Sequence, residues 1–308
     1  MNKKLSVILI ILLTILVCTL VGGLVMLLRS DFDFSSFKIS TGYAEKLEEK
    51  EIENLKDLNI KTKVADIFIE TKEINNIKVE LYSEHAEEYE ITELDNEIKI
   101  VLIEKNRFIS FGKNAKVVVY VPVSYTNNIK IENKTGDINI KELPESDLNV
   151  ELTTGDVEVD KINNATISTT TGDIEIGEAN ELVLSVTTGD IKLENAKSIV
   201  SSATTGDLEI GSVDEVVSST TTGDMKLKNV NNSMNLSATT GDVNINEAII
   251  NENSKIETTT GDINIKTVSN CYIDAKTKVG DTKVNNNDRK SDIELVITSK
   301  VGDIKANY

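Results

Sequence analysis

Ten aspartates between Asp137 and Asp303 each follow a glycine, and these Gly-Asp pairs recur at nearly constant spacing. Successive glycines are 19, 17, 17, 17, 17, 18, 20, 19 and 22 residues apart. Carboxylate oxygens repeated in this way could bind hard divalent cations, of which calcium accepts the most varied geometry. The candidate ligands are the aspartates of the regular repeats: Asp156, Asp173, Asp190, Asp207, Asp224 and Asp242.

A second interpretation gives the same aspartates a structural role. Two unit charges ~5 Å apart in water repel by about 0.8 kcal/mol, so a stack of carboxylates needs something that offsets the repulsion. Backbone N–H groups of each aspartate's own turn could do this, because Asp commonly accepts such bonds in tight turns. The sequence leaves turn hydrogen bonding and calcium binding open, and it indicates no other cofactor.

The repeats themselves predict the elements that position these aspartates. The second and fourth residues after each glycine are apolar, as in Val157 and Val159, and this period of two is typical of a strand. We therefore expect an all-β, single-stranded parallel β-solenoid of stacked ~17–20-residue coils. Glycines at the corners supply the positive φ of a tight bend. The structural glycines are Gly155, Gly172, Gly189, Gly206, Gly223, Gly241 and Gly261.

The third residue after each glycine tests this picture, because stacking makes these residues neighbours on the outer surface. Opposite charges would favour such neighbours. From Glu175 to Lys226 the sign of this residue alternates from one repeat to the next. The column reads Glu158, Glu175, Lys192, Glu209, Lys226, Asn244, Asn264, Lys283 and Lys305.

The front of the chain predicts a membrane anchor. Leu5 to Leu28 is nearly uninterrupted in its apolar character and long enough to cross a bilayer as a helix. Lysines precede this span and aspartates follow it, so the N-terminus is expected in the cytoplasm and the rest outside the cell membrane. We expect four regions: anchor 1–28, juxtamembrane linker 29–56, β capping region with degenerate coils 57–128, and solenoid 129–308.

Details of these regions are also predicted. In the linker, a short helix is expected around Ala44 to Leu55. In the capping region, Val64 to Ile69 resembles a repeat in which Ala65 replaces the glycine. At the far end, Ile293–Ser299 and Asp303–Ala306 are expected to form the last coil. Its exposed edge predicts weak self-association of the solenoid through this C-terminal coil.

The run from Val117 to Ile140, VVVYVPVSYTNNIKIENKTGDINI, together with KVADIFIE and the repeated TTGDI/V units, resembles the bacterial putative-adhesin family of LiaG-like envelope proteins. The similarity extends over residues 57 to 308. It implies a surface-facing solenoid behind a single membrane span, associated in some members with cell-envelope stress systems. It implies no catalytic residues.

Composition narrows the functional classes. The net charge of −18 disfavours nucleic acid and anionic membrane surfaces as direct partners. The chain has no Trp and one His, His85, and no spacing assembles a catalytic triad or a phosphate-binding loop. We expect a non-enzymatic protein acting in adhesion, scaffolding or envelope stress sensing through an envelope or surface ligand. The alternatives are a cation-binding module that uses the aspartates and, more remotely, a polysaccharide-active β-helix enzyme.

Overall fold

The computed structural model describes residues 42–104, 114–286, 288 and 290–308 of the chain. Every regular element in these residues is a β-strand, and the strands pair with one another within one compact unit, Gly42–Tyr308. In this part of the chain no helix has the length and apolar character needed to cross a membrane. The expected span from Leu5 to Leu28 lies outside the described residues.

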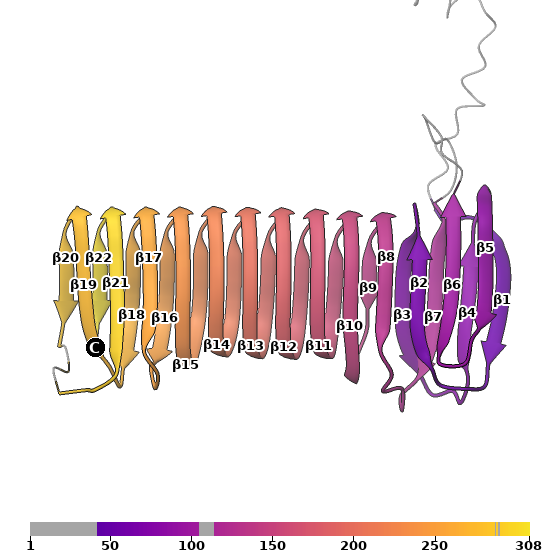
Figure 1. Cartoon of the computed structure of the whole chain (residues 1–308), viewed down its shortest axis with the longest axis horizontal. Coiled ribbons are helices and arrows are strands. Elements are labelled where there is room, and N and C mark those ends of the chain that lie inside the picture. The colour runs from indigo at the N-terminus through magenta and orange to yellow at the C-terminus, as the bar shows by residue number, and fades with distance from the viewer. Residues whose placement is uncertain (1–41, 105–113, 287, 289) are drawn as a thin grey trace, which may run out of the picture. The chain divides into compact units, whose positions relative to one another are not determined.

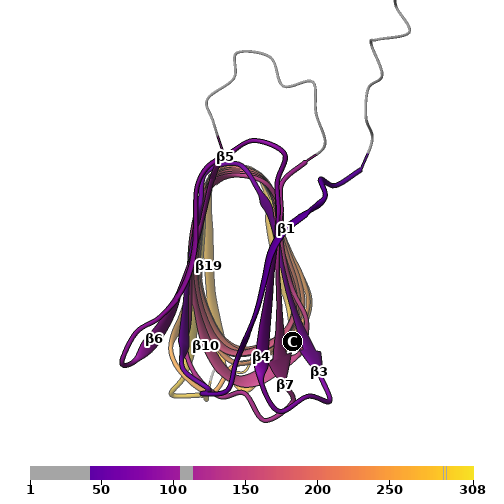
Figure 2. The ribbon, with the colours of Figure 1, turned by 90° about the vertical axis from the view of Figure 1, so that its right-hand side faces the viewer.

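The middle of the unit is a parallel β-solenoid, as the repeats predict (Figure 1). Its strands are β8 (Ile129–Thr135), β9 (Ile138–Ile140), β10 (Leu143–Thr154), β11 (Val157–Thr171), β12 (Ile174–Thr188), β13 (Ile191–Thr205), β14 (Leu208–Thr222) and β15 (Met225–Thr240). Viewed along the coil axis, the coils superimpose as a flattened oval with two long sides (Figure 2). Side A denotes the segments that lead into each Gly-Asp corner, and side B the segments that leave it.

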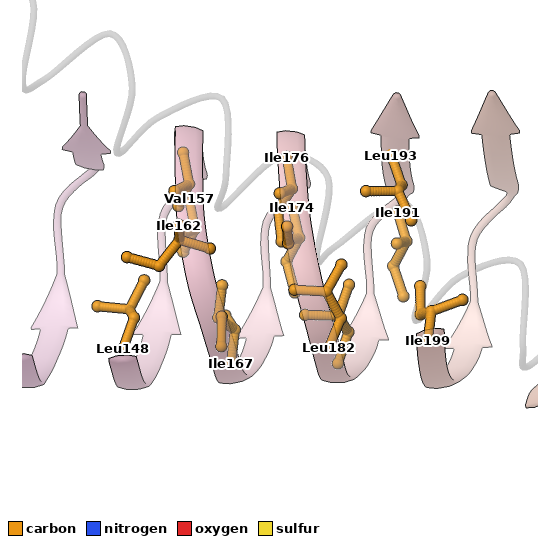
Figure 3. Packing of buried hydrophobic residues seen from close by; sticks show 14 of the residues in the cluster. Leu148, Val157, Ile162, Ile167, Ile174, Ile176, Leu182, Ile191, Leu193 and Ile199 are labelled. Atoms are coloured by element: carbon orange, nitrogen blue, oxygen red, sulfur yellow. The ribbon is translucent and has the colours of Figure 1, made fainter. Parts of the chain in front are cut away.

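The core is built from the alternating apolar residues of both sides. Figure 3 shows Ile174, Ile176 and Leu182 of one coil beside Ile191, Leu193 and Ile199 of the next, and all six are at most 2% exposed. The register is strict: Ile174 pairs with Ile191 and Leu182 pairs with Ile199. Burying an Ile or Leu side chain stabilises by about 1.5–3 kcal/mol, so each coil adds apolar burial to both of its neighbours.

In the regular repeats the outer column of side B has the predicted arrangement, whereas at its far end Lys305 lies between Asn264 and Lys283. Glu175 pairs in register with Lys192, and their side chains form an ion pair of 2.5 Å. Lys192 is in turn in register with Glu209 on the following coil. The stacking inferred from the repeat spacing is therefore confirmed.

In the N-terminal region the spatial order of the strands differs from their order in the chain. They are β1 (Lys46–Ile52), β2 (Asp57–Thr62), β3 (Asp66–Lys72), β4 (Ile77–Tyr82), β5 (Ala86–Glu93), β6 (Glu97–Glu104) and β7 (Lys116–Pro122). The β2–β3 coil pairs with β8 and β9 on its inner side and with β6 and β7 on its outer side. The antiparallel strands β5, β4 and β1 extend this end.

Ala65 occupies the glycine position of the β2–β3 coil, as expected. Its N–H donates to the Thr135 carbonyl at 3.0 Å, the bond that each repeat glycine makes to the next coil. The short helix expected around Ala44 to Leu55 is wrong, because β1 occupies this segment. Two residues of β1 make ion pairs to β4 across the sheet, Lys46 with Glu80 at 2.8 Å and Glu49 with Lys78 at 3.1 Å.

The spatial order of the C-terminal strands also differs from their order in the chain. The expectation that the last strands of the chain form the last coil is therefore wrong. The C-terminal strands are β16 (Val243–Ile249), β17 (Ser254–Thr260), β18 (Ile263–Ser269), β19 (Tyr272–Val279), β20 (Thr282–Asn285), β21 (Glu294–Val301) and β22 (Ile304–Asn307). The last strands of the chain, β21 and β22, pair with β17 and β18 on one side and with β19 and β20 on the other. The outermost coil is therefore β19–β20 (Figure 1).

This order explains the residues that depart from the repeat. Thr282 stands where other coils have a buried apolar residue, and it is exposed because no described coil covers it. Ile304, at the same position in the inserted coil, is fully buried. The predicted self-association through the end of the chain would thus have to use β19 and β20. Lys276, Lys278 and Lys283 on these strands are the kind of charge that protects an edge from pairing.

Two proline substitutions distinguish the inserted coil from the outermost one. Ile304 donates its N–H to the Asp281 carbonyl at 2.9 Å, whereas no described coil lies beyond β20 to accept the equivalent N–H of Thr282. We expect Ile304→Pro to cost about 3 kcal/mol or more of unfolding free energy, and Thr282→Pro less than about 1 kcal/mol. Urea unfolding of Gly42–Tyr308 measures both, with Ile304→Thr correcting for lost apolar contact. Equal losses, or a larger loss for Thr282→Pro, would contradict the insertion.

Candidate functional site

The aspartates after the corner glycines form one continuous hydrogen-bonded column, here called the aspartate ladder. In each step, the backbone N–H of one aspartate donates to Oδ1 of the aspartate on the preceding coil, at 2.7–3.0 Å. In spatial order its members are Asp66, Asp137, Asp156, Asp173, Asp190, Asp207, Asp224, Asp242, Asp262, Asp303 and Asp281. The ladder thus follows the coils, not the chain order.

Three hydrogen bonds join neighbouring coils at each corner. Gly189 donates its N–H to the Thr205 carbonyl at 3.0 Å, and Ile191 donates to the Asp207 carbonyl at 2.9 Å. In the opposite direction, the N–H of Asp207 donates to Oδ1 of Asp190 at 2.7 Å. A slip of one residue between coils would break all three bonds, so the corner fixes the register.

Each Gly-Asp corner requires its glycine for two reasons: its backbone conformation, and the lack of room for a Cβ atom. The ten glycines that precede Asp have φ between 128° and 152°, a region that other residues rarely adopt. A Cβ atom added at Gly206 would lie 1.9 Å from the carbonyl oxygen of Gly189. The close approach of successive glycine backbones brings each aspartate N–H within reach of the previous carboxylate.

The turn interpretation of the aspartates is therefore correct in kind, but the donor is different. Each carboxylate from Asp66 to Asp303 in the ladder accepts the N–H of the next coil's aspartate and not an N–H of its own turn. The spacing of one repeat could not reveal this contact. A hydrogen bond to a charged group contributes roughly 1.5–3 kcal/mol, more than the ~0.8 kcal/mol of repulsion between neighbouring charges in water. The ladder can hold a row of like charges for this reason.

The six candidate calcium ligands, Asp156 to Asp242 in the regular repeats, all belong to the ladder, and one oxygen of each is engaged in it. In the residues that the structure describes, no group of three or more His, Cys, Asp or Glu side chains could hold a metal ion. Calcium binding by these aspartates stays a prediction.

A charged cluster on the N-terminal strands was not predicted from the sequence. Glu80 is 5% exposed and accepts bonds from Lys46 at 2.8 Å and from the Tyr82 hydroxyl at 2.6 Å, and it pairs with Lys78 at 3.0 Å. Burial would raise the pKa of Glu80, but its bonds to Lys46, Tyr82 and Lys78 prevail and lower that pKa to about 2. The carboxylate is thus held ionised, as a brace between β1 and β4 and not as a proton donor.

His85 and the free cysteine Cys271 lie next to the ends of different strands and are isolated from one another. His85 lies in the turn between β4 and β5, half-buried, and its backbone N–H donates to the Ser83 hydroxyl at 2.9 Å. Cys271 is fully buried, and burial, with a smaller contribution from Asp288, raises the pKa of its thiol to about 11. Neither arrangement supplies a nucleophile with an adjacent base.

Substitutions at Asp190 separate hydrogen bonding from charge. Asp190→Asn keeps an Oδ1 acceptor for the Asp207 N–H and removes a like charge, so its unfolding free energy should stay within about 0.5 kcal/mol of the native chain or rise slightly. Asp190→Ala leaves the N–H without its acceptor and should cost roughly 1–2 kcal/mol. Urea unfolding of Gly42–Tyr308 measures both. If both variants lost the same stability, the carboxylate's charge and not its accepted bond would be what matters.

Solved structures match the chain over most of its length, at low sequence identity and low TM-score. A structure from Bacteroides fragilis, described as "a putative adhesin", is 14% identical with a TM-score of 0.42, and the match covers 87% of this chain and 99% of that one. A "putative lipid binding protein" from Parabacteroides distasonis is 13% identical, with a TM-score of 0.42 and the same coverage. A "putative cell adhesion protein" from Clostridium sporogenes is 15% identical, with a TM-score of 0.25, covering 85% and 99%.

At these identities and scores, the likeness assigns no activity to the chain. No curated protein matches it. A family model does match, over residues 55–210 and 196–308, and so includes the degenerate first coil, the regular repeats and the inserted last coil. The chain therefore belongs to the Toastrack family, DUF4097.

Proposed function

We propose that this protein is a non-catalytic β-solenoid, held at the cell membrane by Leu5 to Leu28 with its solenoid outside, and that it acts in adhesion. The observation that carries the proposal is the use of the repeated polar groups. The aspartates and corner amides of successive coils are bonded to one another, so the repeats build a rod and not a reaction centre. A rod of this kind presents the same surface many times over.

Other observations support this reading. The composition is acidic and includes a single histidine, and this histidine, His85, is too far along the fold from Cys271 to act with it as a catalytic pair. The Bacteroides fragilis and Clostridium sporogenes proteins carry the descriptions "a putative adhesin" and "a putative cell adhesion protein", which agree with this proposal. Scaffolding or envelope stress sensing would use the same rod with a different partner.

Surface display tests the proposal. The full chain, with a C-terminal tag, is produced in a non-adherent bacterium, and a chain lacking Leu5 to Leu28 serves as the control. We expect the tag on intact cells to be accessible to protease, and the cells to clump or to be retained on a surface under flow more than control cells. Display at the surface without any gain in clumping or retention would contradict adhesion. A tag protected from protease would contradict the orientation.

A further inference from the structure

Side A of the regular solenoid carries a face without charged residues. It consists of the three outward residues nearest the Gly-Asp corner on each of five successive coils, from Thr166, Ser168 and Thr170 on β11 to Asn235, Ser237 and Thr239 on β15. All of its residues are Ser, Thr, Val or Asn, and all are exposed. We call this surface the neutral face.

The opposite side of the same five coils is charged. Its outer column reads Glu158, Glu175, Lys192, Glu209 and Lys226. Charged residues border the neutral face along the axis, with Glu151 on the coil before it and Lys255 and Glu257 on the coil after it. Two exposed glutamates, Glu181 and Glu215, border it on the edge away from the corner. In a chain of net charge −18, such a break in the charge pattern is unlike a surface selected only for solubility.

A line of exposed valines crosses the neutral face. Val183, Val200 and Val217 lie in register on three neighbouring coils and are 51%, 50% and 48% exposed. Toward the corner their neighbours are serines and threonines, which, like valine, lose little rotamer freedom when they are covered. Away from the corner, Glu181 lies beside Val183 and Glu215 beside Val217. The pairings of β11 to β14 on this side contain no bulge, so the face is regular.

We propose that the neutral face is where a second copy of this chain packs, face to face, and that this contact contributes to the adhesion proposed above, on which the inference rests. Two chains of charge −18 repel each other over most approaches, and the repulsion is least where both surfaces are uncharged. Charged partners would find no counter-charge on this face. A second copy also has the same ~4.8 Å coil spacing, so side chains can interdigitate along the whole face.

The size of the face sets the strength of this contact. Five coils at ~4.8 Å and three outward residues per strand give roughly 400 Å² on each copy, or about 800 Å² in total. Stable protein interfaces bury about 1,200–2,000 Å², so the contact should be weak and reversible. Many weak contacts between arrayed chains add up through avidity, which suits an adhesive surface.

Sedimentation of Gly42–Tyr308 from about 10 μM to about 1 mM tests the inference, since this weak class of interface associates in that range. We expect mass to rise toward the dimer, and Val200→Glu to weaken association at least tenfold. Asn264→Glu adds the same charge to an exposed position on side B and should leave association unchanged. A native unit that is monomeric throughout, or variants that associate equally, would overturn the proposal.

Cross-linking locates the contact without relying on a disruptive charge. Ser202→Cys places a thiol at the centre of the neutral face, and Glu209→Cys places one on side B. Cys271 is the only other cysteine of the unit and is buried, so it should not react. A short bismaleimide should give dimers from Ser202→Cys and not from Glu209→Cys, and the reverse or equal yields would overturn the assignment. If the unit stayed monomeric while displayed chains still conferred adherence, this inference would fail and the proposed function would stand.

Discussion

The approach of one corner glycine to the next is the constraint on which the rest of the structure depends. With a carbonyl oxygen where a Cβ would be, neighbouring coils meet closely enough for each aspartate to accept the following aspartate's N–H. That bond fixes the register, and the register stacks isoleucine on isoleucine inside and glutamate beside lysine outside. Core burial provides most of the stabilisation, but the corners decide which residues are buried together.

Both ends of the solenoid follow the same rule with a different chain path. Asp66 starts the ladder from a coil whose glycine is replaced by Ala65, and Asp281 ends it, although Asp303 comes later in the sequence. A corner can make its hydrogen bonds to any neighbouring coil that has the same geometry, whether or not that coil comes next in the sequence. An end coil can therefore be inserted, which places the chain's last strands under the cover of β19 and β20.

The local pattern predicted the regular coils, their side B column and the degenerate repeat at Ala65. Each of these depends on the alternation of apolar and polar residues within a single segment. The inserted coil was missed, because Gly280 and Gly302 carry nearly the same motif and spacing says nothing about which coil lies next to which. Thr282 was the available signal, since a polar residue at a core position marks an end. The acceptor of each aspartate N–H is also a property of two coils, and the Glu- and Lys-rich β1 is a strand only because β4 lies beside it.

Hydrogen exchange of the aspartate amides tests the aspartate ladder most directly. Asp173, Asp190 and Asp262 are exposed residues at tight corners, where an amide facing water would exchange quickly, yet each donates its N–H at 2.7–2.8 Å. The account predicts slow exchange for these amides, comparable with that of the core strands, and faster exchange for Asp281 on the outermost coil. Exchange of the Asp173, Asp190 and Asp262 amides at the rate of unprotected loops would contradict the ladder as the interaction that fixes the coils.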